Sequence, residues 1–207
     1  ARKNTDYNRL DTLAIKLQGG PFSALYADVI KYPQYIFNDG NLVNYEFSFD
    51  KATEINNRSV YVVKFKPRPD IIEPMHSGKL YIDVDSYSLI SAIYNLNVEN
   101  REMATELFVK KKPTGVTVYP TEAAYRVDYR LKDNQWYYGY SNIQLTFKVN
   151  WRGRLFNSVY TLSSEMAITD WQKSLDDGFT RKETLRPSVI LSDEASGFSD
   201  PRFWGEY

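Results

Sequence analysis

The sequence predicts an α+β domain with a mainly antiparallel sheet and helices that cover one of its faces. Three observations favour this class. Apolar and polar residues alternate with period two in several segments, as they do in strands with one buried face. Polar turn residues divide these segments into hairpins. Helical spacing is confined to a few segments, and the 15% of aromatic residues suits half-buried strands.

Length and composition limit what the chain can be. Its 207 residues suffice for a proper core, and we expect a single β-rich domain over residues 1–207 with a less regular tail from about Ile168. The 26 basic and 26 acidic residues cancel, so charge gives no reason to expect a nucleic-acid partner. Cysteine is absent, which excludes disulfides and thiolate metal sites. No run approaches the ~18–20 apolar residues that span a bilayer, so no transmembrane segment is expected.

Two helices are predicted near the beginning of the chain. The first has apolar residues at helical spacing over Leu10–Leu17 and stops at the glycine pair that follows. The second begins at Pro21, because proline is favoured in the first turn of a helix. Its apolar stripe consists of Phe22, Leu25, Tyr26, Val29 and Ile30.

Strands are predicted to follow. The first covers Val43–Phe49, and a hairpin over Thr53–Lys66 turns at Asn56–Arg58. The segment Lys66–Ser77 is rich in proline and charge, which forbids a regular ladder and predicts a loop that could act as a flap.

The clearest hairpin covers Gly78–Val98. In its first strand Leu80, Ile82 and Val84 are expected on the buried face, with Lys79, Tyr81 and Asp83 on the polar one. The turn is expected at Asp85–Ser88. In the second strand the predicted buried residues are Ile90, Ala92, Tyr94, Leu96 and Val98.

The second half repeats the pattern after one more helix. This helix is predicted over Glu99–Val109, with Asn97 as its cap. A turn is expected at Lys132–Gln135. The predicted strands are Val116–Val118, Tyr125–Leu131, Trp136–Val149 and Trp151–Ser163, the last with a bend at Gly153.

No set of residues in the sequence indicates an enzyme, and no cofactor is expected. His76 is the only histidine, and a general base needs a nucleophile or an orienting carboxylate within hydrogen-bond reach. Because His76 lies in the proline-rich segment, we expect an exposed loop histidine. A glycosidase needs two carboxylates at a fixed separation, which a sequence does not define. The acidic residues considered for such a pair are Asp170, Asp176, Asp177 and Glu183.

Two features admit both a binding and a structural interpretation. Asp83 and Asp85 could share a calcium ion, but a full set of oxygen ligands is missing, and Asp85 is typical of the start of a hairpin turn. We therefore predict no metal site. Trp136, Tyr138 and Tyr140 lie on one face of a strand with a further tyrosine between them. They could stack sugars or bind a partner, but burial under a helix or the tail is the favoured interpretation.

The segment GKLYIDVDSYSLISAIYNLNVENREMATELFVKKKP, with GGPFSALYADVIKYP before it and DPRFWGEY at the end, resembles a Bacteroidetes family of exported proteins. These proteins usually carry an N-terminal carboxypeptidase-regulatory-like β-sandwich, so the resemblance implies that this chain is their C-terminal part. The arrangement is also similar to the LolA-like fold, a curved, open antiparallel half-barrel that carries lipoproteins or lipids through the periplasm. This likeness implies two or three helices on the concave face of the sheet.

These expectations predict a non-enzymatic cell-envelope domain that binds an apolar ligand, a lipid or a lipoprotein acyl chain, under a helical lid. The residues expected to line the hollow are Phe22, Leu25, Tyr26, Val29, Tyr45, Phe47, Ile82 and Tyr94. A solid core in place of a hollow is equally compatible with the pattern. The alternative is an interaction or scaffold module that binds an envelope protein through the aromatic strand Trp136–Tyr140. Either function places the chain in the periplasm or at the cell surface, with outer-membrane association as an option.

Overall fold

A computed structural model describes residues 23–37, 40–109, 112, 114–153 and 155–172 of the chain. The predicted helix at Leu10–Leu17, Phe22, and the acidic residues beyond Trp171 lie outside these ranges. The elements, with η for 3-10 helices, are α2 (Ser23–Tyr26), η2 (Pro33–Tyr35), η3 (Leu42–Asn44), β1 (Tyr45–Phe49), β2 (Thr53–Ile55), β3 (Arg58–Pro67), β4 (His76–Asp83), β5 (Leu89–Leu96), α3 (Arg101–Phe108), β6 (Val116–Lys132), β7 (Gln135–Trp151) and β8 (Ser158–Ala167).

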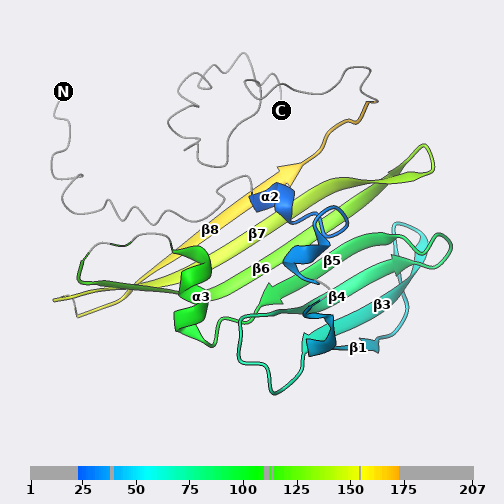
Figure 1. Ribbon diagram of the computed structural model, residues 1–207. Helices are drawn as coiled ribbons and strands as arrows, with labels where there is room; N and C mark the ends of the chain where they lie inside the picture. Colours follow the sequence, from blue (N-terminus) through cyan, green and yellow to red (C-terminus); the bar gives the residue numbers. More distant parts are fainter. Residues whose placement is uncertain (1–22, 38–39, 110–111, 113, 154, 173–207) are drawn as a thin grey trace, which may run out of the picture.

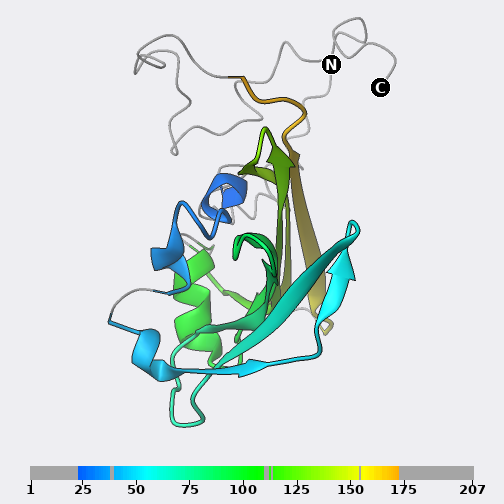
Figure 2. The same ribbon diagram turned by 90° about the vertical axis from the view of Figure 1, so that its right-hand side faces the viewer.

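The strands form one eight-stranded sheet in which neighbouring strands are antiparallel (Figure 1). Their order is β1-β3-β4-β5-β6-β7-β8, with β2 paired to β3. The sheet is open, because β1 and β8 form its two edges. Figure 2 shows α2 and α3 on the same side of the sheet, where α3 contacts β6 and α2 contacts β7 and β8. The prediction of a mainly antiparallel, open sheet with few helices is confirmed for the described residues.

The tight turns follow from residues that tolerate a left-handed backbone. Asn56 and Asn57 have φ angles of 51° and 60°, and Asp133 and Asn134 have φ angles of 49° and 60°. Two successive residues with positive φ make a turn whose twist matches that of a hairpin, and Asn and Asp adopt this conformation at low cost. The turns predicted at Asn56–Arg58 and Lys132–Gln135 are therefore confirmed.

The strands predicted at Val116–Val118 and Tyr125–Leu131 are parts of one strand, β6. The pairing of β6 with β7 shifts its register between Pro120 and Glu122. Such a bulge accommodates a proline, which has no N–H to give to the ladder. β7 ends at Trp151, and Gly153, with a φ of 90°, lies in the connection to β8 instead of bending a strand.

The second predicted helix is much shorter than its apolar stripe. It ends at Tyr26, and the Asp28 carboxylate accepts hydrogen bonds from the backbone N–H groups of Ile30 and Lys31, at 3.2 and 3.1 Å. A local bond of this kind offers the backbone a turn in place of a helix. Val29 is consequently buried, while Leu25 and Ile30 are exposed.

The other two helix and strand predictions need smaller corrections. α3 lies within the predicted range, but its cap is Asn100, whose side chain accepts a hydrogen bond from the Met103 N–H. Asn97 instead accepts from the N–H of Glu99 outside the helix. The strand predicted from Val43 begins at Tyr45, because Leu42–Asn44 form a turn of 3-10 helix.

The hairpin predicted over Gly78–Val98 is confirmed, but its turn is organised by a different aspartate. Asp83 was expected on the polar face, yet its side chain is fully buried. It accepts two hydrogen bonds from Arg58, at 2.6 and 2.8 Å, and two from Ser86, at 2.9 and 2.6 Å. Asp85, predicted to begin the turn, is 84% exposed. A register shift after Tyr81 changes which side chains of β4 are buried.

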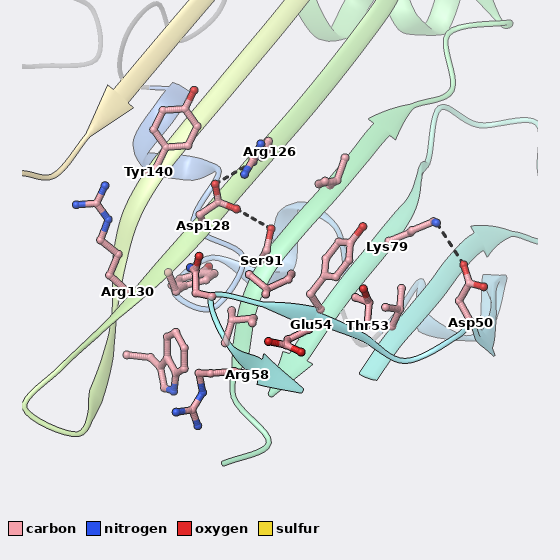
Figure 3. Close-up of a pocket in the computed structure, with 18 of the residues that line it drawn as sticks. Asp50, Thr53, Glu54, Arg58, Lys79, Ser91, Arg126, Asp128, Arg130 and Tyr140 are labelled. Carbon is pink, nitrogen blue, oxygen red and sulfur yellow. Dashed lines mark hydrogen bonds and ion pairs between the residues drawn. The ribbon is translucent and has the colours of Figure 1, made fainter. Parts of the chain in front are cut away.

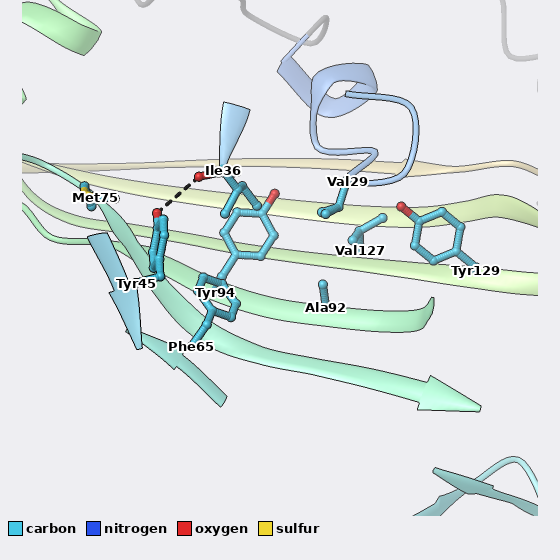
Figure 4. Packing of buried hydrophobic residues seen from close by; sticks show 9 residues of the cluster. All are labelled: Val29, Ile36, Tyr45, Phe65, Met75, Ala92, Tyr94, Val127 and Tyr129. Carbon is cyan, nitrogen blue, oxygen red and sulfur yellow. Dashed lines mark hydrogen bonds between the residues drawn. The ribbon is translucent and has the colours of Figure 1, made fainter. Parts of the chain in front are cut away.

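The largest core cluster lies between the sheet and the segment around α2 and η2 (Figure 4). In β5 the residues Ile90, Ala92, Tyr94 and Leu96 are buried as predicted. Full burial of a large apolar side chain stabilises a fold by about 1.5–3 kcal/mol, so this cluster holds the helical segment on the sheet. Its members are Val29, Ile36, Tyr45, Phe65, Met75, Ala92, Tyr94, Val127 and Tyr129.

Candidate functional site: an uncharged cavity between the helices and the sheet

A cavity of about 330 Å³ lies between the sheet and the helical segments. Its volume is at the lower end of the about 300–1,000 Å³ that is usual for small-molecule sites. The helical side contributes Tyr26, Tyr35, Ile36, Leu107 and Phe108, and the sheet and the loop before β4 contribute Tyr45, Met75, His76, Tyr94, Leu96 and Tyr125, among others.

Tyrosines of the sheet hold the helical side of the cavity in place. The hydroxyl of Tyr138, on β7, donates a hydrogen bond to the Ala24 carbonyl. The hydroxyl of Tyr129, on β6, donates to the Asp28 carboxylate at 2.8 Å. The hydroxyl of Tyr45 donates to the Ile36 carbonyl at 3.2 Å. These bonds anchor three points of the segment that runs from α2 to η2.

The other wall is α3. Ala104 faces the sheet with no exposed surface, and its small side chain lets the helix approach β6 closely. Phe108, at the end of the helix, contacts Phe147 edge to face, with ring centroids 5.9 Å apart. This contact directs the end of α3 toward the sheet, and Leu107 and Phe108 both reach the cavity.

Three aromatic rings from neighbouring strands form the floor. Tyr94 and Tyr125 are stacked, with centroids 5.0 Å apart and an interplanar angle of 9°. His76 meets both rings edge to face, at 5.4 Å from Tyr94 and 5.6 Å from Tyr125. Tyr94 is directly opposite Gly78 on one side and Tyr125 on the other. A Cβ atom at Gly78 would collide with the Ile93 carbonyl and the Tyr94 backbone, so this close packing requires glycine.

The cavity is electrically neutral. None of the residues that line it is an aspartate, glutamate, lysine or arginine. Burial lowers the pKa of His76 to about 4, so the imidazole is uncharged at pH 7. Burial also raises the pKa of Tyr94 and Tyr125 well above the usual value, which keeps both hydroxyls protonated. The site therefore offers apolar surface and neutral hydrogen-bonding groups.

The structure brings together only part of the predicted hollow. Tyr26, Tyr45 and Tyr94 line the cavity, and Val29 is buried in the adjoining core cluster. Leu25 and Phe47, however, are 45% and 47% exposed, because α2 is short and β1 is an edge strand. Ile82 is half-buried on β4 and does not line the cavity.

Sequence reasoning found Tyr94 but missed the rest of the floor and the far wall. His76 was assigned to a loop, but β4 begins with it, and its ring packs edge to face against two tyrosines. Tyr125 could have been found from the sequence, since it alternates with polar residues on the buried face of its strand. Leu107 and Phe108 belong to the third predicted helix, and only the fold shows that they reach the cavity.

A larger groove of about 860 Å³ lies on another part of the sheet, where β2 crosses in front of the strands (Figure 3). Its charged groups are largely paired with one another. Arg126 and Ser91 donate to Asp128, at 2.8 and 2.6 Å, and Lys79 donates to Asp50 at 3.2 Å. The carboxylates of Asp128 and Asp50 are therefore engaged with other side chains of the protein.

Carboxylates near this groove form ion pairs with neighbouring basic side chains. The Arg58 guanidinium lowers the pKa of Asp83, which stays ionised in its salt bridge and is not free to share a cation with Asp85. Within the described residues, no group of three or more His, Cys, Asp or Glu side chains could hold a metal ion. Asp170, one of the acids considered for a glycosidase pair, forms a surface ion pair with Lys132 at 3.0 Å.

The aromatic strand is engaged with the protein itself. Trp136 is half-buried against the main core cluster, with the Arg58 guanidinium 5.7 Å from its ring. Tyr137 packs against Trp171, with centroids 5.9 Å apart, and Tyr138 is hydrogen-bonded to α2. Tyr138 thus contacts a helix and Tyr137 contacts the segment after β8, whereas Tyr140 is half-buried and lines the larger groove.

Comparison of the chain with protein-family models, curated proteins and solved structures gives no significant match. No helix in the described part of the chain is long and apolar enough to cross a membrane.

Proposed function

We propose that the chain is a non-enzymatic cell-envelope domain that binds the acyl chain of a lipid or lipoprotein in the cavity between its helices and its sheet. The observation that carries this proposal is a cavity of about 330 Å³ whose lining contains no charged side chain. Such a site accepts an apolar ligand at little cost, whereas an ionic group would lose its hydration there without a counter-charge.

The arrangement of elements supports the same proposal. An open antiparallel sheet with helices on one side is the arrangement that the LolA-like likeness implies. In that fold the hollow between helices and sheet holds the acyl chain. The resemblance to exported Bacteroidetes proteins supports a location in the periplasm or at the cell surface, with outer-membrane association as an option.

The first experiment asks whether the purified domain carries or takes up an acyl chain. Native mass spectrometry and solvent extraction would identify a co-purifying lipid, and displacement of N-phenyl-1-naphthylamine would measure uptake of fatty acyl probes. Each buried methylene contributes about 0.8 kcal/mol, so we expect affinity to rise with chain length until the cavity is full. A domain that holds no lipid and takes up no probe of any length would overturn the proposal.

A pair of variants on α3 connects uptake to this cavity. Leu107 lines the cavity and is 48% exposed, so Leu107→Arg should place a charge at its mouth without unfolding the domain. Met103 is 36% exposed on the same helix and does not line the cavity, so Met103→Arg is the matched control. We expect uptake to be lost in the first variant only. Equal uptake by both variants would indicate that the ligand binds at another site.

The alternative function, an interaction module for an envelope protein, is favoured by a different observation. β8 is an edge strand with exposed apolar side chains, among them Val159 and Leu162 at 64% and 42% exposure. An edge of this kind can pair with a strand of another protein. If the domain takes up no acyl probe, Leu162→Lys should weaken capture of an envelope partner, and unchanged capture would exclude β8 as the contact.

A further inference from the structure

We infer that His76, Tyr94 and Tyr125 form a recognition site for an uncharged acyl ester at the floor of the cavity. This inference rests on the proposed function, because it states which group of an acyl ligand the site selects. The three side chains come from β4, β5 and β6, and their rings lie within 5.6 Å of one another, centroid to centroid. All three line the cavity.

Among the described residues, the polar atoms of these side chains have no hydrogen-bond partner. No hydrogen bond links the hydroxyl of Tyr94, the hydroxyl of Tyr125 or the imidazole of His76 to another group of the described ranges. The Tyr94 side chain is nevertheless only 3% exposed. Buried polar groups in proteins nearly always have a hydrogen-bond partner. A partner supplied by the ligand would satisfy these groups.

The hydrogen-bonding capacity of the three side chains indicates which kind of ligand atom they would bind. A protonated tyrosine hydroxyl donates a hydrogen bond, and a neutral imidazole has one donor and one acceptor nitrogen. The site thus has several donors for one neutral oxygen, as in an ester carbonyl. An ionised carboxylate is disfavoured, because no lysine or arginine lines the cavity to compensate its charge. A plain hydrocarbon would leave the donors unsatisfied.

Three probes of equal chain length test the inference on the full chain: methyl decanoate, decanoate at pH 8, and decane. Loss of one neutral hydrogen bond changes affinity by roughly fivefold to tenfold, so the ester should bind the wild-type domain at least that much more tightly than decane. Decanoate should bind more weakly than the ester. In the variant Tyr94→Phe/Tyr125→Phe, the preference for ester over decane should fall by roughly fivefold or more, because two hydroxyl donors are removed and only the imidazole of His76 remains.

Tyr61→Phe is the matched control, since Tyr61 is 38% exposed on β3 and does not line the cavity. It should keep the ester preference. Infrared spectroscopy gives a second measurement on the wild type alone: the carbonyl stretch of the bound ester should lie at lower frequency than that of the same ester in hydrocarbon, and an unshifted stretch would overturn the ester site. This second measurement decides the question even if the double variant fails to fold.

The failures of the two proposals are distinguishable. Equal affinity for ester and decane in the wild type, or an ester preference of unchanged size in the double variant, would overturn the ester site and leave the apolar cavity in place. If none of the three probes binds, the proposed function and the ester site are both overturned. If the ester site holds, a diacyl phospholipid and a diacylated lipopeptide, compared in competition with methyl decanoate, would show which source of acyl ester the cavity prefers.

Discussion

At the scale of single residues, burial of His76 determines the charge that the cavity offers to a ligand. The imidazole packs edge to face against two stacked tyrosine rings, and burial lowers its pKa to about 4. Protonation would place a charge in an apolar site without a carboxylate to compensate it. The cavity therefore remains neutral down to mildly acidic pH.

The same burial predicts how stability depends on pH. An unfolded histidine titrates near about 6.5, so between that pH and the folded pKa of about 4 only the unfolded chain binds the proton. The free energy of unfolding should therefore decrease as pH falls from about 6.5, by about 3 kcal/mol at pH 4 from this group. Urea unfolding between pH 7 and pH 4 measures this. His76→Gln should remove most of that decrease, and an identical pH dependence in variant and wild type would contradict the burial of His76.

Asp83 is a second residue whose burial determines what it does: it holds the hairpin turn between β4 and β5 together. It is fully buried and ionised, and it bonds to Arg58 and Ser86, whereas Asp85 two residues later is exposed. Removing one partner of a buried charge pair leaves the other without its hydrogen bonds, so Asp83→Asn should lower the free energy of unfolding by about 2–4 kcal/mol. Asp85→Asn should leave the urea midpoint unchanged. Equal effects of the two changes would contradict the conclusion that Asp83, rather than Asp85, organises the hairpin.

At the scale of elements, turn residues determine where the hairpins form, whereas contacts with the rest of the fold determine how long the helices are. β6 and β7 are long strands joined by Asp133 and Asn134, both with positive φ. α2, in contrast, has an apolar stripe long enough for a longer helix and ends at Tyr26, because Asp28 bonds to the local backbone and to Tyr129. A tertiary bond thus limits an element that local pattern would extend.

The turn between β6 and β7 gives a prediction at this scale. A side chain with a branched Cβ pays about 1–2 kcal/mol in the left-handed region, so Asn134→Val should lower the free energy of unfolding by that amount. Asn134→Gly should leave it equal or slightly higher, because glycine adopts positive φ without strain. Thermal or urea unfolding distinguishes the two variants. A valine variant as stable as the wild type would show that the turn does not have the described backbone.

At the scale of the whole molecule, the twisted sheet separates two environments. The apolar cavity lies between the helical segments and the sheet. The charged groove lies where β2 crosses the strands (Figure 3). β6 serves both, because Tyr125 lines the cavity and its neighbour Arg126 lines the groove. Alternation along one strand is thus enough to place neutral and charged groups apart.

This separation predicts that the groove does not contribute to binding of an acyl probe. Arg130 is exposed and lines the groove, so Arg130→Ala should change neither the unfolding midpoint nor the affinity for methyl decanoate. Leu107→Arg, on the cavity side, should lose the probe. The same displacement assay measures both variants. Loss of affinity in Arg130→Ala would indicate that the groove and the cavity belong to one continuous site.

The sequence by itself determined the features that depend on neighbours along the chain. Alternation placed Tyr94 and Ala92 on a buried face, and the asparagine pair before Arg58 placed a hairpin turn. Period-two patterns and turn chemistry act over a few residues, so they can be recognised without a structure. The sheet, its antiparallel pairing and the uncharged character of its inner face follow from them.

Only the tertiary structure decided which side chains meet. His76 packs against Tyr125, nearly fifty positions away, and Asp83 is buried by Arg58 from another strand. Leu107 and Phe108 reach the cavity because α3 packs on β6, and Leu25 does not because α2 stops early. The burial and the pKa of a side chain depend on segments that are far apart in the sequence and meet only in the fold. A local sequence pattern contains no information about which of these segments meet.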